Sequence, residues 1–185
     1  MQRVDWATGA LHGPDVQSSR KTIGDLKNLF LDRAAAENLP AETLLYTVQW
    51  WSPVSAGTEG ALFWGNTVIE PGKIGREYFM THGHTHAKAD RTEFYSTVQG
   101  TGALILMDGN RKTWFEEMMP GSLHHIPART AHRVANTGST QLRFAACWPS
   151  DAGYNYDAVR SKGFSARLLT VDGAPKLVDE ASARA

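Results

Sequence analysis

Short apolar segments separated by glycine, proline and asparagine run through the chain from Leu44 to Trp148. Each is roughly five to nine residues long and rich in β-branched and aromatic side chains, as β-strands usually are. A series of such strands with turn residues between them is typical of an all-β sandwich or barrel. The segments are LLYTVQWW, ALFWGNTVIE, REYFMTHGHTH, TEFYSTVQG, GALILM, KTWFEEM, SLHHIP, AHRVANT and LRFAACW.

The two ends of the chain have different patterns. Residues 1–21 read as an irregular arm or a short strand. Thr22 with Asp25 three positions later indicates a helix start of the capping-box type, and Pro40 should end that helix. At the other end, ARLLTVDGAPKLVDE predicts a β-hairpin that turns at Asp172-Gly173, followed by ASARA as a frayed tail. The apolar face of the expected helix is Ile23, Leu26, Leu29 and Phe30.

Composition narrows the class of protein. No linker, repeat or low-complexity segment divides the 185 residues, so we expect one domain over 1–185 with its barrel core at about 44–150. The 19 basic residues balance the 19 acidic ones, which argues against nucleic acid or an anionic membrane as partner. With no membrane-spanning run, no signal-peptide pattern and a single cysteine, Cys147, the chain is expected to be cytoplasmic, with that thiol buried and no internal disulfide.

Three histidines and one glutamate form the most specific pattern in the chain. His84 and His86 lie two positions apart, so both side chains of a strand would point to the same face. Glu93 lies inside TEFYSTV, which is the next expected strand, and His132 lies further on, in GSLHHIPARTAHRVAN. Imidazoles plus one carboxylate suit a divalent first-row metal, and four ligands leave positions open for water or substrate. Such an open site favours catalysis over a purely structural role.

These residues resemble the two motifs of the cupins. The resemblance implies an all-β cupin jelly-roll β-barrel, with a short N-terminal helical segment and a C-terminal β-hairpin, and a metal in the barrel mouth. Two departures are visible: the gap from His86 to Glu93 is longer than the general pattern, and Arg129 replaces the usual glycine. The turn at Arg129 is therefore expected not to need positive φ. The remaining motif positions are Gly100, Gly121, Pro127 and Asn136.

Two longer segments resemble a particular cupin family, the archaeal-type glucose-6-phosphate isomerases. One is PGKIGREYFMTHGHTHAKADRTEFYSTVQGTG, including its long gap before Glu93, and the other is WPSDAGYNYDAVRSKGFSARLL. The resemblance covers roughly residues 44–170. It implies an enzyme of glycolysis and gluconeogenesis that interconverts glucose 6-phosphate and fructose 6-phosphate, and it implies a homodimer. The aromatic strands around Trp50, Trp51, Phe63 and Trp64 would supply the surface between subunits unless the N-terminal helix covers them.

The resemblance also assigns roles at the metal site. His84, His86, Glu93 and His132 match the metal ligands of the family. The expected ion is Fe²⁺, with Mn²⁺, Ni²⁺ and Zn²⁺ as alternatives, one per subunit. Glu93 would move the proton between C1 and C2 through a cis-enediolate, although a direct hydride shift remains an alternative. Tyr95 shares the face of Glu93 and either relays a proton or packs in the barrel.

The substrate phosphate must be held without a P-loop, because the chain has no such motif. The resemblance implies that hydroxyl and backbone N–H groups bind it instead, from Tyr46, Thr67, Thr81, Gly83 and Tyr156. Several converging neutral donors can hold a dianion where water is excluded. Other residues near the site are not expected to contact the substrate. Lys88 and Arg91 should be solvated or paired, His82 should lie behind the site or in solvent, and His124 and His125 should be ordinary strand residues. Trp148 cannot relay a proton, because an indole only donates.

Three other functions remain open from the sequence. A cupin dioxygenase would have a largely apolar site and would consume oxygen. A mannose-6-phosphate isomerase would differ only in the orientation of one substrate hydroxyl. A non-catalytic sugar-phosphate sensor would use the metal only to organise the pocket, but no DNA-binding module accompanies the barrel.

Overall fold

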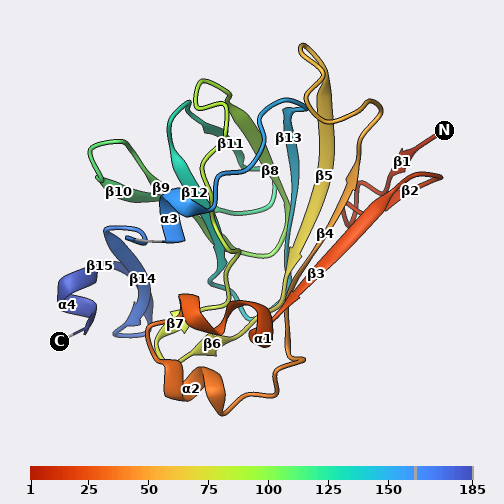
Figure 1. Ribbon diagram of the computed structural model, residues 1–185. Helices are drawn as coiled ribbons and strands as arrows, with labels where there is room; N and C mark the ends of the chain where they lie inside the picture. The colour runs from red at the N-terminus through yellow and green to blue at the C-terminus, as the bar shows by residue number, and fades with distance from the viewer. Residues whose placement is uncertain (161, 185) are drawn as a thin grey trace.

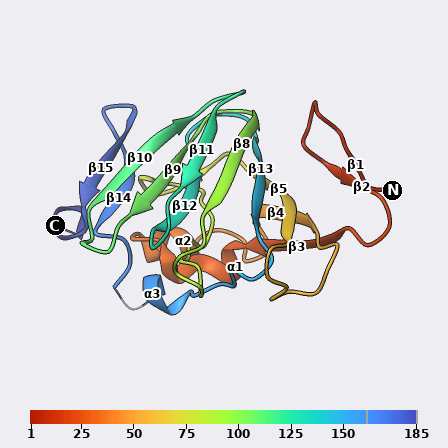
Figure 2. The same ribbon diagram turned by 90° about the horizontal axis from the view of Figure 1, so that it is seen from above.

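Two β-sheets form the body of the computed structural model, which describes residues 1–160 and 162–184. The larger sheet has six strands in the order β11, β8, β13, β5, β4 and β3, and the smaller has the order β10, β9 and β12 (Figures 1 and 2). The expected cupin jelly-roll barrel is confirmed. The strands of the larger sheet are β3 (Gln17–Thr22), β4 (Leu44–Trp51), β5 (Leu62–Ile69), β8 (Glu93–Gln99), β11 (Leu123–Ile126) and β13 (Leu142–Pro149), and those of the smaller are β9 (Gly102–Met107), β10 (Thr113–Met118) and β12 (Ala131–Asn136).

Alternating burial places one face of β8 and one face of β11 inside the barrel. In β8, Glu93, Tyr95 and Thr97 are buried whereas Phe94 is exposed, as the alternation predicted. Strand β9 is buried along its whole length and lies between β10 and β12. Both sheets contribute to one apolar core, whose fully buried members include Leu45, Ile69, Leu104, Leu106, Val134 and Leu142. The core therefore fixes the inward direction of the side chains at the barrel mouth.

Smaller elements surround the barrel. The predicted C-terminal hairpin is confirmed as β14 (Ala166–Val171) and β15 (Ala174–Asp179), which extend a sheet with β7 (Glu77–Tyr78) and β6 (Lys73–Ile74). The expectation of a frayed tail is wrong, because Glu180–Arg184 forms helix α4, with an ion pair between those two residues. The N-terminal arm contains a small hairpin, β1 (Arg3–Val4) with β2 (Leu11–His12), and α3 spans Asp157–Arg160. In the described part of the chain, no helix is long and apolar enough to span a membrane.

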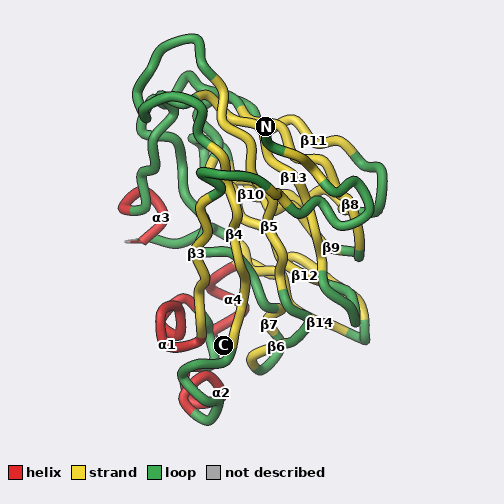
Figure 3. The backbone as a smooth tube through the Cα atoms, turned by 90° about the vertical axis from the view of Figure 1, so that its right-hand side faces the viewer, coloured by secondary structure: helices red, strands yellow, loops and turns green. Residues whose placement is uncertain are grey.

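The N-terminal helix is shorter and more broken than predicted. Its capping box, Thr22 with Asp25, is present, but α1 covers only Ile23–Leu26, followed by the 3-10 turn η1 (Lys27–Leu29) and by α2 (Arg33–Glu37) (Figure 3). Phe30 adopts an extended backbone, and Asp32 starts a second helix by accepting a hydrogen bond from the N–H of Ala35. A second capping residue, two positions after the last apolar residue of the predicted face, thus begins a new helix.

The predicted strand over 76–86 is also interrupted. Only β7 is regular, and the chain beyond it makes single bridges, Met80 to Ala135, His84 to His132 and Thr85 to Asn155. Gly83 has φ of +79°, a conformation that ends regular pairing at this point. His84 is nevertheless fixed beside β12, because it exchanges two backbone hydrogen bonds with His132, of 3.1 and 2.9 Å.

The expectation for the turn at Arg129 is wrong. Arg129 has φ of +60°, so this exposed residue adopts the left-handed conformation that the usual glycine would adopt. Its N–H donates to the carbonyl of Ala89, which holds the turn in place. A side chain in this conformation is strained by about 1 kcal/mol.

Replacing Arg129 by glycine should therefore stabilise the protein. Relief of strain outweighs the greater backbone freedom of glycine in the unfolded chain, so we expect a gain of about 0.5–1 kcal/mol in the free energy of unfolding. Arg129→Ala is the matched control, because it removes the same side chain but keeps the Cβ. Urea denaturation of the three proteins measures the difference, and equal stability of the two variants would contradict the argument.

Candidate metal centre and adjoining cavity

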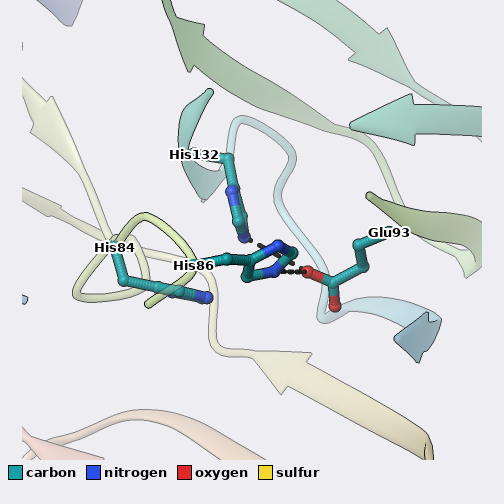
Figure 4. Close-up of side chains that lie close together, drawn as sticks. All are labelled: His84, His86, Glu93 and His132. Carbon is teal, nitrogen blue, oxygen red and sulfur yellow. Dashed lines mark hydrogen bonds and ion pairs between the residues drawn. The ribbon is translucent and has the colours of Figure 1, made fainter. Parts of the chain in front are cut away.

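Four donor side chains converge at the barrel mouth (Figure 4). His84 and His86 come from the bridged segment after β7, Glu93 is the first residue of β8, and His132 is the second residue of β12. One ligand atom from each lies within 4.8 Å of the others, and three of the four residues are buried. The structure thus brings together the four residues that the sequence analysis named, although the strand expected for the two neighbouring histidines is irregular.

Hydrogen bonds outside the cluster orient two of the imidazoles. Nδ1 of His86 donates to the carbonyl of Arg91 at 2.9 Å, and Nδ1 of His132 donates to the carbonyl of Thr130 at 3.2 Å. A proton fixed on Nδ1 leaves Nε2 as the free donor of a lone pair, which is the usual support of a metal-binding histidine. Both Nε2 atoms point toward the centre of the cluster (Figure 4).

Unpaired buried atoms show that the cluster fits a cation. Nε2 of His84 and Nε2 of His132 are both buried without a hydrogen-bond partner. The latter lies 3.3 Å from Oε2 of Glu93 but lacks hydrogen-bond geometry. Nε2 of His86 lies 3.2 Å from the same oxygen, a contact that needs a second proton on this imidazole, and a bound cation would replace that proton. Buried polar atoms are rarely left unpaired. A divalent ion between three imidazoles and one carboxylate would satisfy them all.

The cluster shifts the acidity of its own members. Burial alone would raise the pKa of Glu93, but the neighbouring imidazoles of His132 and His86 outweigh it and lower this pKa to about 2. Burial and the nearby His132 hold the pKa of His84 well below its usual value. The carboxylate is thus anionic and His84 neutral at pH 7, the protonation states in which both can bind a metal.

The long gap between His86 and Glu93 is held by ion pairs. Asp151 receives Lys88 Nζ at 2.8 Å and the guanidinium of Arg91 at 2.8 and 3.0 Å, and these partners lower the pKa of its carboxyl. Lys88 and Arg91 are therefore paired, as expected. The backbone N–H of Lys88 also donates to the carbonyl of Ala152. These contacts join the loop between His86 and Glu93 to the segment that follows β13.

A cavity of about 560 Å³ opens beside the cluster. The hydroxyl of Thr81 accepts the N–H of Val134 at 3.0 Å and keeps its own proton free to donate. A side chain at Gly83 would be strained, because φ is +79° there and a Cβ would lie 2.9 Å from Nε and 3.1 Å from Cβ of Arg133. All five residues expected at the substrate phosphate line this cavity: Tyr46, Thr67, Thr81, Gly83 and Tyr156.

The two inner tyrosines keep their protons. Burial raises the pKa of Tyr46 to about 12, and burial together with Glu93 raises that of Tyr95 well above its usual value. Tyr95 lines the cavity but also packs on Phe144, with ring centroids 4.8 Å apart. Both predicted roles of Tyr95, packing and donation of a proton, are compatible with this position.

The sequence did not predict several of the residues that line the cavity. Lys21 lines the cavity from β3, where Gln17 and Ser19 lie on the same face. If residues 17–22 had been predicted as a strand, the alternation of its side chains would have identified Lys21. Tyr154 lies over His84, with ring centroids 4.9 Å apart, but no local pattern marks it. His82 lines the cavity against Tyr156 at 4.7 Å, so it lies within the site and not behind it. Trp148 is also a lining residue.

Other motif residues are structural. His124 hydrogen-bonds Ser122 and Glu116, away from the cluster, as expected of a strand residue. Asn136 is fully buried, and its amide donates to the carbonyls of Ile69 and Thr140. It therefore fixes the end of β12 to β5. Cys147 is half-buried, whereas the sequence predicted a buried thiol.

Comparison with known proteins shows a close likeness over nearly the whole chain. The family model described as "Glucose-6-phosphate isomerase (GPI)" matches residues 20–181. The glucose-6-phosphate isomerase of Thermococcus kodakarensis is 37% identical over 177 residues, covering 95% of this chain and 92% of the relative. That of Thermococcus onnurineus is 37% identical over 180 residues, covering 96% and 92%. Among solved structures, an oxalate decarboxylase from Bacillus subtilis has a TM-score of 0.48 and 19% identity, covering 64% of this chain and 28% of that one.

Proposed function

This chain belongs to the glucose-6-phosphate isomerase family, and from that premise we propose that it interconverts glucose 6-phosphate and fructose 6-phosphate at the metal centre. The observation that carries the proposal is the position of the His84, His86, Glu93 and His132 cluster at the wall of a cavity large enough for a hexose phosphate. A divalent cation bound there would supply Lewis-acid stabilisation of the oxygens on C1 and C2.

The phosphate would lie at the end of the cavity formed by Tyr46, Thr67, Thr81, Gly83 and Tyr156. The N–H of Gly83 makes no hydrogen bond to another described residue, and the Thr81 hydroxyl has a proton to donate. Such donors hold a dianion without a P-loop. Lys21, on the neighbouring strand, adds a positive charge to this end of the cavity. Binding the phosphate here places the far end of the open-chain sugar at the cluster.

Glu93 would act as the base between C1 and C2. Its carboxylate is 5% exposed, faces the cavity and is anionic at pH 7. Only one of its oxygens lies near His86 and His132, which leaves the other available to take the proton from C2 and return it to C1. Burial of Glu93 and Tyr95 keeps bulk water away from the enediolate.

The phosphate assignment predicts strong selectivity for phosphorylated sugar. In a coupled assay, fructose 6-phosphate should yield glucose 6-phosphate, whereas fructose should be a very poor substrate. Tyr156→Phe removes one hydrogen bond to the dianion, so KM should rise about tenfold with kcat nearly unchanged. Tyr78→Phe, buried away from the cavity, is the control. Comparable kcat/KM for fructose and fructose 6-phosphate would overturn the assignment.

We also propose that the protein is a homodimer that meets through the outer face of its larger sheet. Phe94, Cys147, Trp64 and Trp51 lie in register across four strands of that face, with Phe94 47% exposed. Trp50 and Phe63, also expected there, line the cavity instead. Trp51, Trp64 and Cys147 are half-buried, so the row leaves apolar surface only partly covered, and a second subunit could cover the rest.

Sedimentation at micromolar concentration tests the dimer. The expected mass is about twice the 20.3 kDa of one chain. Phe94→Glu should shift the protein toward the monomer, because dimer formation would then bury an unpaired carboxylate in the interface. Gln99→Glu, at the exposed end of the same strand, should not. A wild-type mass near that of a single chain would refute the proposal.

A further inference from the structure

A second cavity, of about 260 Å³, lies on the other side of β12 from the metal-facing residues. Its lining comes from α2, β7, β12, β14, α4 and the segment after α3, which gather at the left and lower left of Figure 1. Two carboxylates, Glu77 and Glu180, face six cationic side chains: Arg33, Arg133, Arg160, Lys162, Arg167 and Arg184. The charge in this cavity is therefore strongly positive, in a chain with no net charge.

Both carboxylates of the cavity are already paired. Arg167 donates to Glu77 at 2.7 Å and also pairs with Glu180, and Arg184 lies 2.6 Å from Glu180. In the part of the chain that the structure describes, neither Arg33 nor Lys162 makes an ion pair with its side chain. Arg160 lies 3.4 Å from Asp157 and is thus paired at the surface. The positive charges of the cavity that have no counter-ion among the described residues are therefore those of Arg33, Lys162 and Arg133.

Arg133 is a cation of this cavity that lies inside the protein. Its guanidinium donates to the carbonyl of His82 at 3.0 Å and lies 4.4 Å over the ring of Phe164, but it has no carboxylate partner among the described residues. Its Nε is buried without a hydrogen-bond acceptor. A buried cation without an anion is costly unless a ligand supplies one.

We propose that this second cavity is a binding site for a small phosphate-type anion, separate from the phosphate end of the first cavity. Guanidinium groups match the geometry of phosphate oxygens, and Arg133 provides one at the inner wall that has no carboxylate partner among the described residues. Arg33 and Lys162 at the exposed rim would attract and neutralise the dianion. The volume is sufficient for inorganic phosphate or a small phosphomonoester. The site explains the excess of cations in this cavity.

Calorimetric titration of inorganic phosphate into the metal-loaded protein tests the site. Arg33→Gln/Lys162→Gln removes two rim charges without touching the first cavity, and Arg3→Gln/Lys112→Gln is the charge-matched control. We expect the affinity of one phosphate per chain to fall at least tenfold in the first double variant and to be unchanged in the control. Tyr156→Phe, in the first cavity, should leave this affinity unchanged too. Thermal unfolding verifies that all variants are folded.

Two results would overturn the proposal: phosphate binding that is equal in the two double variants, or a loss that follows Tyr156→Phe instead. Glycerol phosphate, titrated in parallel, distinguishes the source of the anion. Tighter binding of glycerol phosphate indicates a phosphorylated metabolite, and tighter binding of inorganic phosphate indicates the free ion. Neither arm requires catalysis, so failure of the isomerase proposal would leave this test valid.

Discussion

Exhaustive removal of divalent metal is expected to reduce turnover of fructose 6-phosphate by about a thousandfold, and Fe²⁺, Mn²⁺ or Ni²⁺ should restore it. The physical reason is the loss of about 4 kcal/mol of electrostatic stabilisation of the enediolate, at roughly tenfold in rate per 1.4 kcal/mol. His86→Ala should lower metal content and turnover together. Metal analysis and the coupled assay, performed on the same samples, measure both.

The control for that variant is His12→Ala, which changes an exposed histidine of β2 far from the cluster in sequence and outside the cavity. It should retain both metal and activity. Full activity in exhaustively chelated protein would show that the four side chains have another role. The buried, unpaired Nε2 atoms of His84 and His132 would then lack an explanation.

Glu93→Gln is expected to lower kcat by about a hundred- to ten-thousandfold, the usual contribution of a positioned general base. The amide cannot accept the proton from C2, although it also weakens metal binding. Metal occupancy must therefore be measured in the same sample, and rates compared per bound metal. Glu117→Gln, an exposed carboxylate on β10, is the matched control and should be fully active.

Turnover in deuterated water separates proton transfer from a hydride shift. If Glu93 carries the proton, some deuterium should appear at C1 or C2. The carboxylate is almost fully buried, so its exchange with solvent is slow and incorporation should be incomplete. Complete retention of the transferred hydrogen, together with substantial activity in metal-loaded Glu93→Gln, would favour the hydride route.

Local patterns predicted the barrel but not its exceptions. Period-two alternation identifies strands such as β8 because Glu93 and Phe94 lie on opposite faces. Apolar residues at helical spacing likewise extended the predicted N-terminal helix through Phe30. That spacing does not show that Asp32 would cap a new helix. At Arg129 the residue type predicted a negative φ, but the observed φ is positive. The hydrogen bond from its N–H to the carbonyl of Ala89, a contact that the local sequence does not show, holds the backbone in this conformation.

The metal cluster was predictable because its members repeat a known spacing, whereas the second cavity was not. Arg133 follows His132 directly, and on a strand it must face the other way. Nothing in the sequence shows what lies on that other side. Its surroundings come from α2, the segment after α3, and β14, whose positions depend on how the chain closes around the barrel.

The pairing of His84 with His132 has a further consequence for how the fold is held together. Their two backbone hydrogen bonds join segments that lie far apart in the sequence, and Glu93 closes a second loop within the first. An ion bound by all of them would act as a non-covalent cross-link, which lowers the entropy of the unfolded chain as a disulfide does. With Cys147 as its only cysteine, this chain cannot form an internal disulfide. The same four side chains would then increase the stability of the folded barrel when the ion is bound.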